Sequence, residues 1–286
     1  LYVTTLGASA DKGGVYKSTD GGDTWSKLNE HFKMCTVWGQ PQLIIHPNNP
    51  SIVYAATWLG GTWKTTDAGE SWTLLEEAPI SSTALSFNTS NPDVIYLADR
   101  SSPTVWKTTD AGSTWEQVAD FSSDGALLVI RVLADGDTVY AATFHPALTG
   151  GKLYKSTNAG SSWTDITGTL PKGILDVAVD PTNPDIVYVT TNINGAYKST
   201  DGGATWAQML NFPDVGAYDI EVDPVDPTIL YASARGGSLP AWFTEIAGDR
   251  PDGVVFTDPA GVYTVSYTHL RAHETRHDLV CRLLLE

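Results

Sequence analysis

The sequence predicts an all-β fold, a β-propeller of four-stranded blades, from its internal repeats, its short strand-like segments and its turn residues. One eight-residue phrase ending in Trp occurs five times, and its third positions (residues 20, 67, 110, 158 and 201) are 47, 43, 48 and 43 residues apart. A repeating unit of about 45 residues has the size of a four-stranded propeller blade. The repeats show no sustained apolar period of 3.6 residues, which argues against helices.

The first copy of the repeat begins inside a blade, whose strands we letter A to D in chain order. Residues 1–5 match residues 53–57, which form strand B of the next copy, so strand A of the first blade is absent. A second phrase, a turn followed by β-branched residues and Tyr, keeps the same spacing. The turn contains Pro in four copies and is shorter in the remaining one. These copies end at Tyr54, Tyr96, Tyr140, Tyr188 and Tyr231.

The copy that ends near residue 208 shows all four strands most clearly. Its segments are short, rich in β-branched residues and bounded by Gly, Pro, Asn and Asp, which is typical of strands. The predicted strands A to D are residues 175–179, 185–190, 195–199 and 205–208.

The phrase ending in Trp predicts the turn between strands C and D. Its Asp is expected to accept bonds from backbone N–H groups two or three residues on. The Gly two residues after the Asp suits a positive φ, and the Trp is expected to pack between blades. These residues are therefore predicted to be structural: Asp20, Trp25, Asp67, Trp72, Asp110, Trp115, Asn158, Trp163, Asp201 and Trp206.

The C-terminal part of the chain departs from the repeat. Residues 235–253 form an insert, and residues 254–261 resemble a degenerate sixth copy without Trp. The copies of the repeat add up to about five to six blades within residues 1–265, and we expect this part of the chain to be a fragment of a larger ring. Residues 266–286 have a different composition and resemble translated adapter or vector read-through, so we expect a non-native tail. Its His269, His273 and His277 have a metal-ligand spacing, but the break in composition outweighs it, and no metal site is predicted.

Composition excludes several classes of function. The 286 residues are 42% hydrophobic and 17% charged, enough to bury a core. The net charge of −16 predicts no binding to nucleic acid, and no apolar run is long enough for membrane insertion. Two cysteines, Cys35 and Cys281, cannot build a disulfide framework. No Gly-rich phosphate loop or other cofactor motif occurs.

We expect ligand binding on the propeller face formed by the B–C and D–A loops, because variable loops on a rigid scaffold carry function. The A–B and C–D turns, which carry the repeated phrases, are expected on the opposite face. Tryptophans in the variable loops are suited to stack on sugar rings, but they are equally suited to blade packing. The candidate ligand-binding residues are Trp38, Trp58, Asp99, Arg100, His145, Asn192, Asn194 and Tyr218.

Two aspartates are candidates for catalysis. Counting twelve residues back from the strand-B tyrosines gives Gln42, Ala84, Leu128, Asp176 and Asp219. Asp176 and Asp219 thus fall at equivalent places in adjacent blades, and a pair of carboxylates is what glycoside hydrolysis needs. The alternative is that each caps a strand or bonds a loop.

The phrase ending in Trp resembles the Asp-box, or bacterial neuraminidase repeat, over roughly residues 1–235. The whole pattern resembles the propellers of xyloglucan hydrolases, of sortilin-type proteins and of photosystem assembly factors. In the xyloglucan hydrolases a catalytic Asp follows strand B in a Thr-Asp-x-Gly-Gly-Ala-Tyr context. Here residues 191–197 read Thr-Asn-Ile-Asn-Gly-Ala-Tyr, with Asn192, which cannot titrate, in the place of that Asp.

The resemblance implies a secreted propeller of a carbohydrate-active protein, with glycoside hydrolysis of β-glucan as one activity. The alternative is a non-catalytic propeller that binds protein or glycan. Sialidase activity is disfavoured, because that chemistry uses three arginines and few arginines occur here outside the tail. The expected location is extracellular or periplasmic. The chain begins with Leu, so we expect an incomplete N-terminus.

Overall fold

The computed structural model describes residues 1–5, 14–28, 42–57, 60–145, 151–171, 173–192, 194–209, 217–234, 256–257 and 262–266. Its contacts divide the chain into two compact units. The first comprises the described residues of Leu1–Ala141 and Ser156–Trp163, and the second those of Ala142–Lys155 and Thr164–Leu283.

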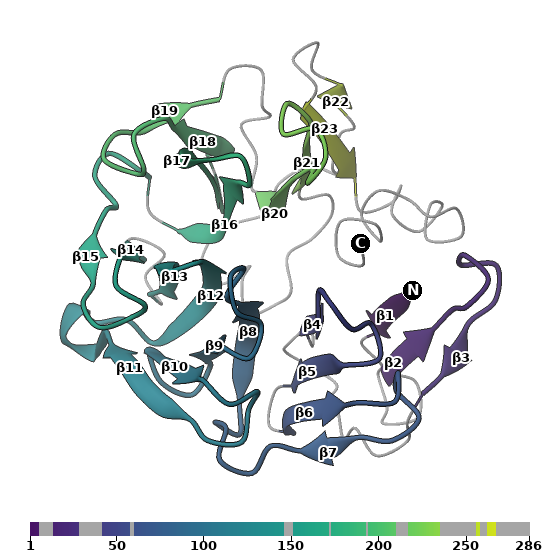
Figure 1. The fold of residues 1–286 in the computed structure, drawn as a ribbon. Helices are drawn as coiled ribbons and strands as arrows, with labels where there is room; N and C mark the ends of the chain where they lie inside the picture. Colours follow the sequence, from purple (N-terminus) through teal and green to yellow (C-terminus); the bar gives the residue numbers. More distant parts are fainter. Residues whose placement is uncertain are drawn as a thin grey trace. The chain divides into compact units, whose positions relative to one another are not determined.

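The described residues form six sheets, five with four strands and one with three. The first sheet contains β1 (Tyr2–Thr5), β2 (Gly14–Lys17) and β3 (Ser26–Lys27). The second contains β4 (Gln42–Ile45), β5 (Val53–Thr57), β6 (Gly61–Thr65) and β7 (Thr73–Leu74). The third contains β8 (Ser82–Phe87), β9 (Ile95–Asp99), β10 (Thr104–Thr108) and β11 (Glu116–Asp120). The fourth contains β12 (Leu128–Asp135), β13 (Thr138–Phe144), β14 (Leu153–Ser156) and β15 (Thr164–Asp165). A short 3-10 helix, Ser122–Asp124, precedes β12 (Figure 1).

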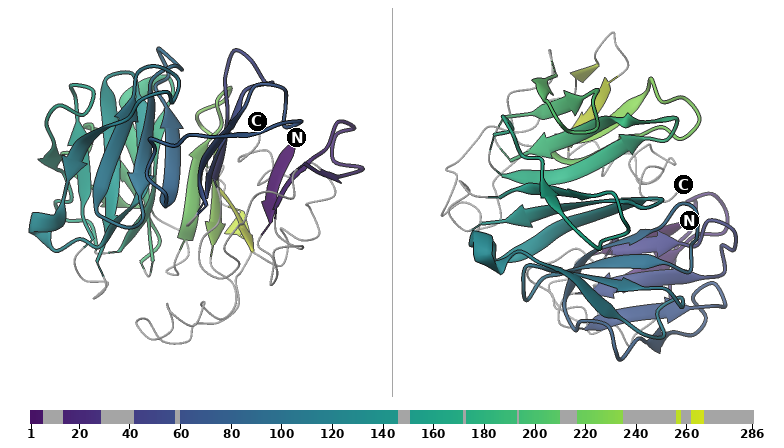
Figure 2. Two further views of the ribbon diagram at one scale, coloured as in Figure 1. Left: turned by 90° about the horizontal axis from the view of Figure 1, so that it is seen from below. Right: turned by 60° about the vertical axis from the view of Figure 1, so that its left-hand side comes forward.

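The fifth sheet confirms the strands predicted from the sequence. It contains β16 (Ile174–Asp180), β17 (Asn183–Thr191), β18 (Ala196–Ser199) and β19 (Ala207–Gln208), joined in chain order by antiparallel pairing. The second and third sheets have the same antiparallel order. Among the described residues the first sheet has three strands and none that corresponds to strand A, as predicted. Figure 2 shows from two further directions that the strands of each sheet lie side by side and twist.

The sixth sheet differs from a repeated blade. Its order is β20 (Ala217–Val222), β21 (Leu230–Ala234), β23 (Val262–Ser266) and β22 (Phe256–Thr257). β23 runs parallel to β21, whereas strand C is antiparallel to strand B in the first, second, third and fifth sheets. A parallel neighbour needs a crossover of a dozen or more residues, and the insert after residue 234 supplies that length. Most of residues 254–261, the predicted sixth copy, lie outside the described residues.

The first three sheets pack face to face through strand B of the second. In β5, Val53 and Ala55 pack with Tyr2 and Val15 of the first sheet, together with the partly buried Trp72. Tyr54, which points to the other face, packs in the cluster that contains residues of the third sheet and Trp115. Side chains that alternate along a strand point to opposite faces, so β5 is buried on both. Trp72 and Trp115, two tryptophans of the repeated phrase, thus pack in clusters between sheets.

The repeated phrase folds into a turn closed by two side chains. Asp67 accepts a bond from the N–H of Ser71 (2.9 Å), four residues on, not two or three as expected. The hydroxyl of Thr65 accepts the N–H of Gly69 (2.9 Å), whose φ is +95°. Ala68 also has a positive φ, +59°. The turn therefore needs two consecutive left-handed residues, of which the sequence predicted one.

A second repeated contact joins neighbouring sheets at these turns. The hydroxyl of Tyr54 and the ammonium of Lys64 both donate to the carbonyl of Ala111, in the turn of the next sheet, at 2.9 Å each. Lys64 also lies 5.2 Å from the centre of the Tyr54 ring. Burial lowers the pKa of Lys64 and raises the pKa of Tyr54. The same carbonyl position accepts from a strand-C lysine in three other copies: Lys17 to Ala68, Lys107 to Ala159 and Lys155 to Gly202.

Candidate functional site

Each sheet has two distinct ends. The A–B turn bonds the C–D turn, as in Ala68 N–H to the carbonyl of Ser51 (2.8 Å), and we call this the box end. The B–C and D–A loops meet at the opposite end, which we call the loop end. There Gly61 N–H donates to the carbonyl of Ile80 (2.9 Å), and Asn192 N–H donates to that of Gly173 (2.8 Å). Of the candidate ligand-binding residues, Asp99, Arg100, His145, Asn192 and Asn194 are described, and they lie at the end of strand B or just after it, at the loop end.

Asp176 is buried at the loop end of β16, with 2% of its surface exposed. It follows a β-bulge, a feature that re-aims a side chain. One carboxylate oxygen accepts the N–H of Val177 (2.8 Å), and the other accepts the N–H of Ile220 (3.1 Å), in strand A of the next sheet. The carboxylate thus ties two neighbouring strands together.

A neutral side chain makes the same contact elsewhere. Gln42, which like Asp176 lies twelve residues before a strand-B Tyr, accepts the N–H of Leu85 at 2.5 Å. Leu85 and Ile220 each lie eleven residues before the Tyr of their own strand B. The contact therefore does not depend on a charge. Asp219, which also lies at a β-bulge, is exposed. Its catalytic pairing with Asp176 stays a prediction.

By residue count, Arg131 occupies in the fourth sheet the position that Asp176 occupies in the fifth. β12 and β13 are joined by only two residues, Gly136 and Asp137. The earlier count of twelve residues back from Tyr140 gave Leu128. Because this hairpin is three residues shorter than the A–B turns of the other sheets, the equivalent residue is Arg131. The strand-A positions at the loop end thus carry unlike side chains from sheet to sheet.

Asp99 is bonded within its own loop. It is 7% exposed, and its carboxylate accepts the N–H of Ser101 and the hydroxyl of Ser102, both at 2.7 Å, as well as that of Thr104 at 3.3 Å. The following Arg100 is half-buried, and burial lowers its pKa. Its N–H donates to the carbonyl of Ser81 (3.2 Å).

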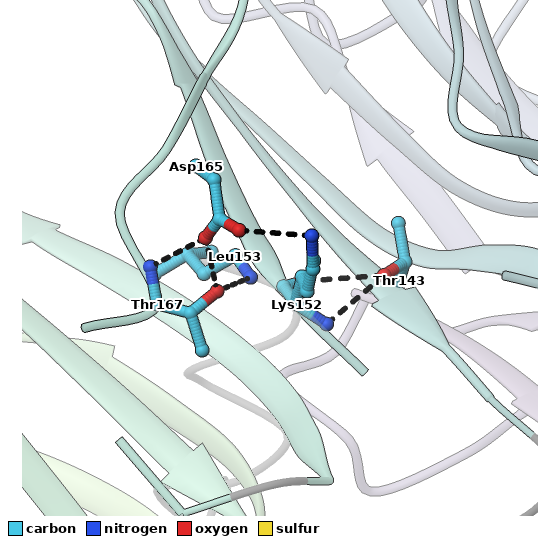
Figure 3. A network of polar contacts seen from close by, with 5 residues as sticks. All are labelled: Thr143, Lys152, Leu153, Asp165 and Thr167. Atoms are coloured by element: carbon cyan, nitrogen blue, oxygen red, sulfur yellow. Dashed lines mark hydrogen bonds and ion pairs between the residues drawn. The ribbon is translucent and has the colours of Figure 1, made fainter. Parts of the chain in front are cut away.

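A polar network holds the corresponding loop of the fourth sheet (Figure 3). Thr143 accepts the N–H of Lys152 (3.0 Å), whose ammonium pairs with Asp165 (3.1 Å). The N–H and hydroxyl of Thr167 donate to Asp165, and Leu153 N–H donates to Thr167. Burial raises the pKa of Asp165, but the bonds from Thr167 and Lys152 outweigh it, so the pKa is lowered. The network fixes both ends of this loop.

Asn192 has an unusual environment. Its side chain is 1% exposed, and among the described residues neither Oδ1 nor Nδ2 has a hydrogen-bond partner. A Cβ on Gly173, whose φ is +89°, would collide with the amide. Gly173 is thus needed for Asn192 to occupy this place. The next polar residue of the loop, Asn194, is half-buried, and its carbonyl accepts from Gln208 (3.2 Å).

The remaining predicted residues are placed only in part. His145 is half-buried at the end of a described range. Trp38, Trp58 and the side chain of Tyr218 lie outside the described residues, as do the three tail histidines. Among described residues, no group of three or more His, Cys, Asp or Glu could hold a metal ion. No helix in the part of the chain that the structure describes is long and apolar enough to cross a membrane.

Sequence reasoning missed two features. A lysine recurs three residues before the Asp or Asn of each repeated phrase, at positions 17, 64, 107, 155 and 198. The first four of these lysines bond the C–D turn of the next sheet. This regularity could have identified them. It also missed Ile80 and Leu127, aliphatic residues of D–A loops that are 65% and 52% exposed. No sequence signal separates them from buried aliphatic residues.

Comparisons with known proteins agree with this architecture. A family model described as sortilin, neurotensin receptor 3, matches residues 13–143. No curated protein matches the chain. A GH74 enzyme from Niastella koreensis is 24% identical over 77% of this chain and 39% of its own length, with a TM-score of 0.63. The GH74 xyloglucanase from Xanthomonas campestris is 20% identical over 80% of this chain and 41% of its own, with a TM-score of 0.61.

YCF48 bound to D1 peptide is also similar, with 21% identity over 76% of this chain and 68% of its own and a TM-score of 0.56. The chain spans only 31% to 41% of the length of the GH74 structures that it matches. At these identities the likeness is one of fold. The chain thus has the fold of a partial β-propeller of four-stranded blades, of the Asp-box type, similar to the propellers of xyloglucanases and of sortilin.

Proposed function

We propose that this chain is a non-catalytic binding propeller that holds a glycan or a protein at its loop end. The observation that carries the proposal is the state of Asp176. Its two carboxylate oxygens are engaged by backbone N–H groups in a buried site, and a neutral Gln makes the same contact in another sheet. A general acid or base must instead reach the proton it transfers.

Asn192 supports the same proposal. It stands where the xyloglucan hydrolases carry a catalytic Asp, and an amide neither donates nor takes a proton as an acid or base. Its side chain is buried, so it is also withdrawn from the surface that a polysaccharide would contact. Fold likeness to xyloglucanases does not supply the missing group, because chemistry depends on the site and not on the fold.

The second candidate is that the chain is part of a larger secreted hydrolase of the xyloglucan-hydrolase type. The length comparison favours it, since the chain matches only 31% to 41% of the length of the GH74 structures. In such an enzyme the catalytic pair comes from two propellers. Asp219, which is exposed, is then the carboxylate of this chain that could supply one member of that pair. An extracellular or periplasmic location belongs to this proposal.

Hydrolysis and stability measurements on Asp176 and Asp219 variants test these alternatives. The proposal predicts no release of reducing ends from xyloglucan or related β-glucans by the full chain. It also predicts that Asp176→Ala lowers the free energy of unfolding by about 2 kcal/mol, because two buried N–H groups lose their acceptor. Asp219→Ala is the matched control and is expected to change stability by less than about 0.5 kcal/mol. Release of reducing ends that either substitution abolishes, without loss of stability, would favour the hydrolase.

A further inference from the structure

Two exposed aliphatic side chains occupy corresponding places at the loop end of the first unit. Ile80 lies two residues before β8, and Leu127 lies immediately before β12. Their exposed fractions are 65% and 52%. Scattered single apolar residues are common on protein surfaces, so the question is whether these two form one surface.

The backbone limits the distance between the two residues. β8 and β12 are neighbouring A strands, and the hydroxyl of Thr83 in β8 donates to the carbonyl of Val129 in β12 at 2.6 Å. Ile80 is three residues from Thr83, and Leu127 is two residues from Val129. At no more than 3.6 Å per residue, their Cα atoms lie at most about 25 Å apart. An extended segment of about eight residues spans that distance.

Both loops are held by hydrogen bonds. The carbonyl of Ile80 accepts the N–H of Gly61, and the adjacent Ser81 accepts the N–H of Arg100. The loop before Leu127 contains the short 3-10 helix Ser122–Asp124, capped by Gly125 in a left-handed conformation. Side chains presented from a fixed backbone lose little further entropy on binding. These aliphatic residues are therefore suited to act as anchors for a partner.

Acidic side chains flank both anchors. Glu76 and Glu77 lie on the loop that leads to Ile80, and Asp124 lies three residues before Leu127; all three are exposed. In each loop a carboxylate thus stands three residues before the exposed aliphatic residue. We call these five exposed residues the Ile80–Leu127 surface; they combine aliphatic groups with negative charge.

We propose that the Ile80–Leu127 surface binds an extended segment of a partner protein that carries aliphatic side chains next to Lys or Arg. Branched aliphatic side chains contact other aliphatic groups well, but they lack the flat aromatic face that stacks on a sugar ring. The carboxylates complement basic residues and repel acidic ones. This inference rests on the proposed binding function and names its ligand as a protein.

The test uses the full chain and immobilised decapeptides of three compositions: basic with aliphatic, acidic with aliphatic, and basic with Ser and Gly. We expect the basic–aliphatic set to bind at least tenfold more tightly than either other set. The double variant Ile80→Ser/Leu127→Ser is expected to weaken that binding at least tenfold. Glu77→Gln/Asp124→Asn is expected to weaken it and to reduce its dependence on salt. Equal binding of the two basic sets, or unchanged binding by the Ile80→Ser/Leu127→Ser variant, would overturn the inference.

Val225→Ser provides the matched control. Val225 is an aliphatic residue that is 91% exposed, but it lies in an A–B turn at the box end, so its substitution is expected to leave peptide binding unchanged. Xyloglucan oligosaccharide is the parallel probe. If it binds and the double variant weakens it while no peptide set binds, the partner class is wrong and the binding function stands. If neither probe binds, or if the chain releases reducing ends, the proposed function fails as well.

Discussion

Asn192 is the residue whose environment is hardest to explain by stability alone. A buried amide without partners costs about 1–3 kcal/mol relative to one that is hydrogen-bonded, and both polar atoms of Asn192 are in that state. The hydroxyl of Thr190, two residues earlier, is also buried without a partner among the described residues. A local arrangement that costs stability is commonly found at sites where function constrains the residue.

Substitution of Asn192 tests this cost. Asn192→Leu has a similar shape and no polar atoms, so we expect it to raise the free energy of unfolding by about 1 kcal/mol. Asn192→Asp buries a carboxylate without a partner and is expected to lower stability at pH 7. Urea denaturation of the three proteins measures both effects. A leucine variant less stable than the parent would show that the amide is satisfied in solution.

At the scale of the element, the C–D turn of the repeated phrase (the box turn) surrounds its Asp carboxylate with hydrogen-bond donors. The stability of this turn therefore responds predictably to acid. Hydrogen bonds from the hydroxyl and N–H of Thr205 hold the pKa of Asp201 at about 2, and the N–H of Thr114, with hydroxyl bonds, holds that of Asp110 at about 2. The pKa values of Asp20 and Asp67 are also well below the usual value, for the same reason. In the fourth copy Asn158 makes the corresponding bonds to Ser162 without a titrating group.

These shifts fix the sign of the pH dependence. A carboxylate whose pKa is lower in the folded state stabilises the fold above its unfolded pKa, near 4, and loses that contribution as the pH falls towards 2. We therefore expect Asp110→Asn to lower stability at pH 6 and to matter progressively less below pH 4. Asn158→Asp is the converse control, which should add acid sensitivity. Chemical denaturation between pH 2 and pH 6 measures both, and parallel curves for parent and Asp110→Asn would contradict the prediction.

The sequence predicted the elements of the repeat well, because turn residues and strand residues recur at a fixed spacing. The strands of the fifth sheet and the missing strand of the first were anticipated in this way. The contact of Asp176 with Ile220 was not, because it joins strands of different sheets and depends on a bulge that no residue pattern marks. The parallel placement of β23 was missed for a related reason: pairing across a long insert is set by tertiary contacts.

The site was less predictable than the fold. Loop-end candidates were chosen as residue types that can bind ligands, and Asp99 is bonded within its own loop instead. Ile80 was not chosen, because an aliphatic residue beside a strand is usually buried, and only the structure shows its exposure. Residue type identifies the side chains that are able to bind a ligand. Which side chains are exposed to a partner depends on how the chain packs, and only the structure shows that.

At the scale of the whole molecule, the charge of −16 is the dominant electrostatic feature. A large net charge destabilises the compact state through self-repulsion, and the box aspartates remain ionised and exposed at neutral pH. The strand-C lysines donate to backbone carbonyls of the box turns, so each brings a positive charge to the box end without cancelling the excess. Screening of the remaining repulsion should therefore stabilise the fold.

Salt concentration is the simplest way to change the repulsion between these charges. Raising NaCl from about 0.01 M to about 0.15 M shortens the screening length from about 30 Å to about 8 Å, which removes repulsion between sheets while leaving contacts within a turn largely intact. We expect the unfolding temperature to rise by about 2–4 °C, the change that about 1 kcal/mol produces in a chain of this size. Thermal unfolding followed by circular dichroism measures it, with glucose at equal osmolarity as the uncharged control. A fall in the unfolding temperature would mean that attractive ion pairs outweigh the net repulsion, and the acidic surface would then be internally compensated instead of available to a basic partner.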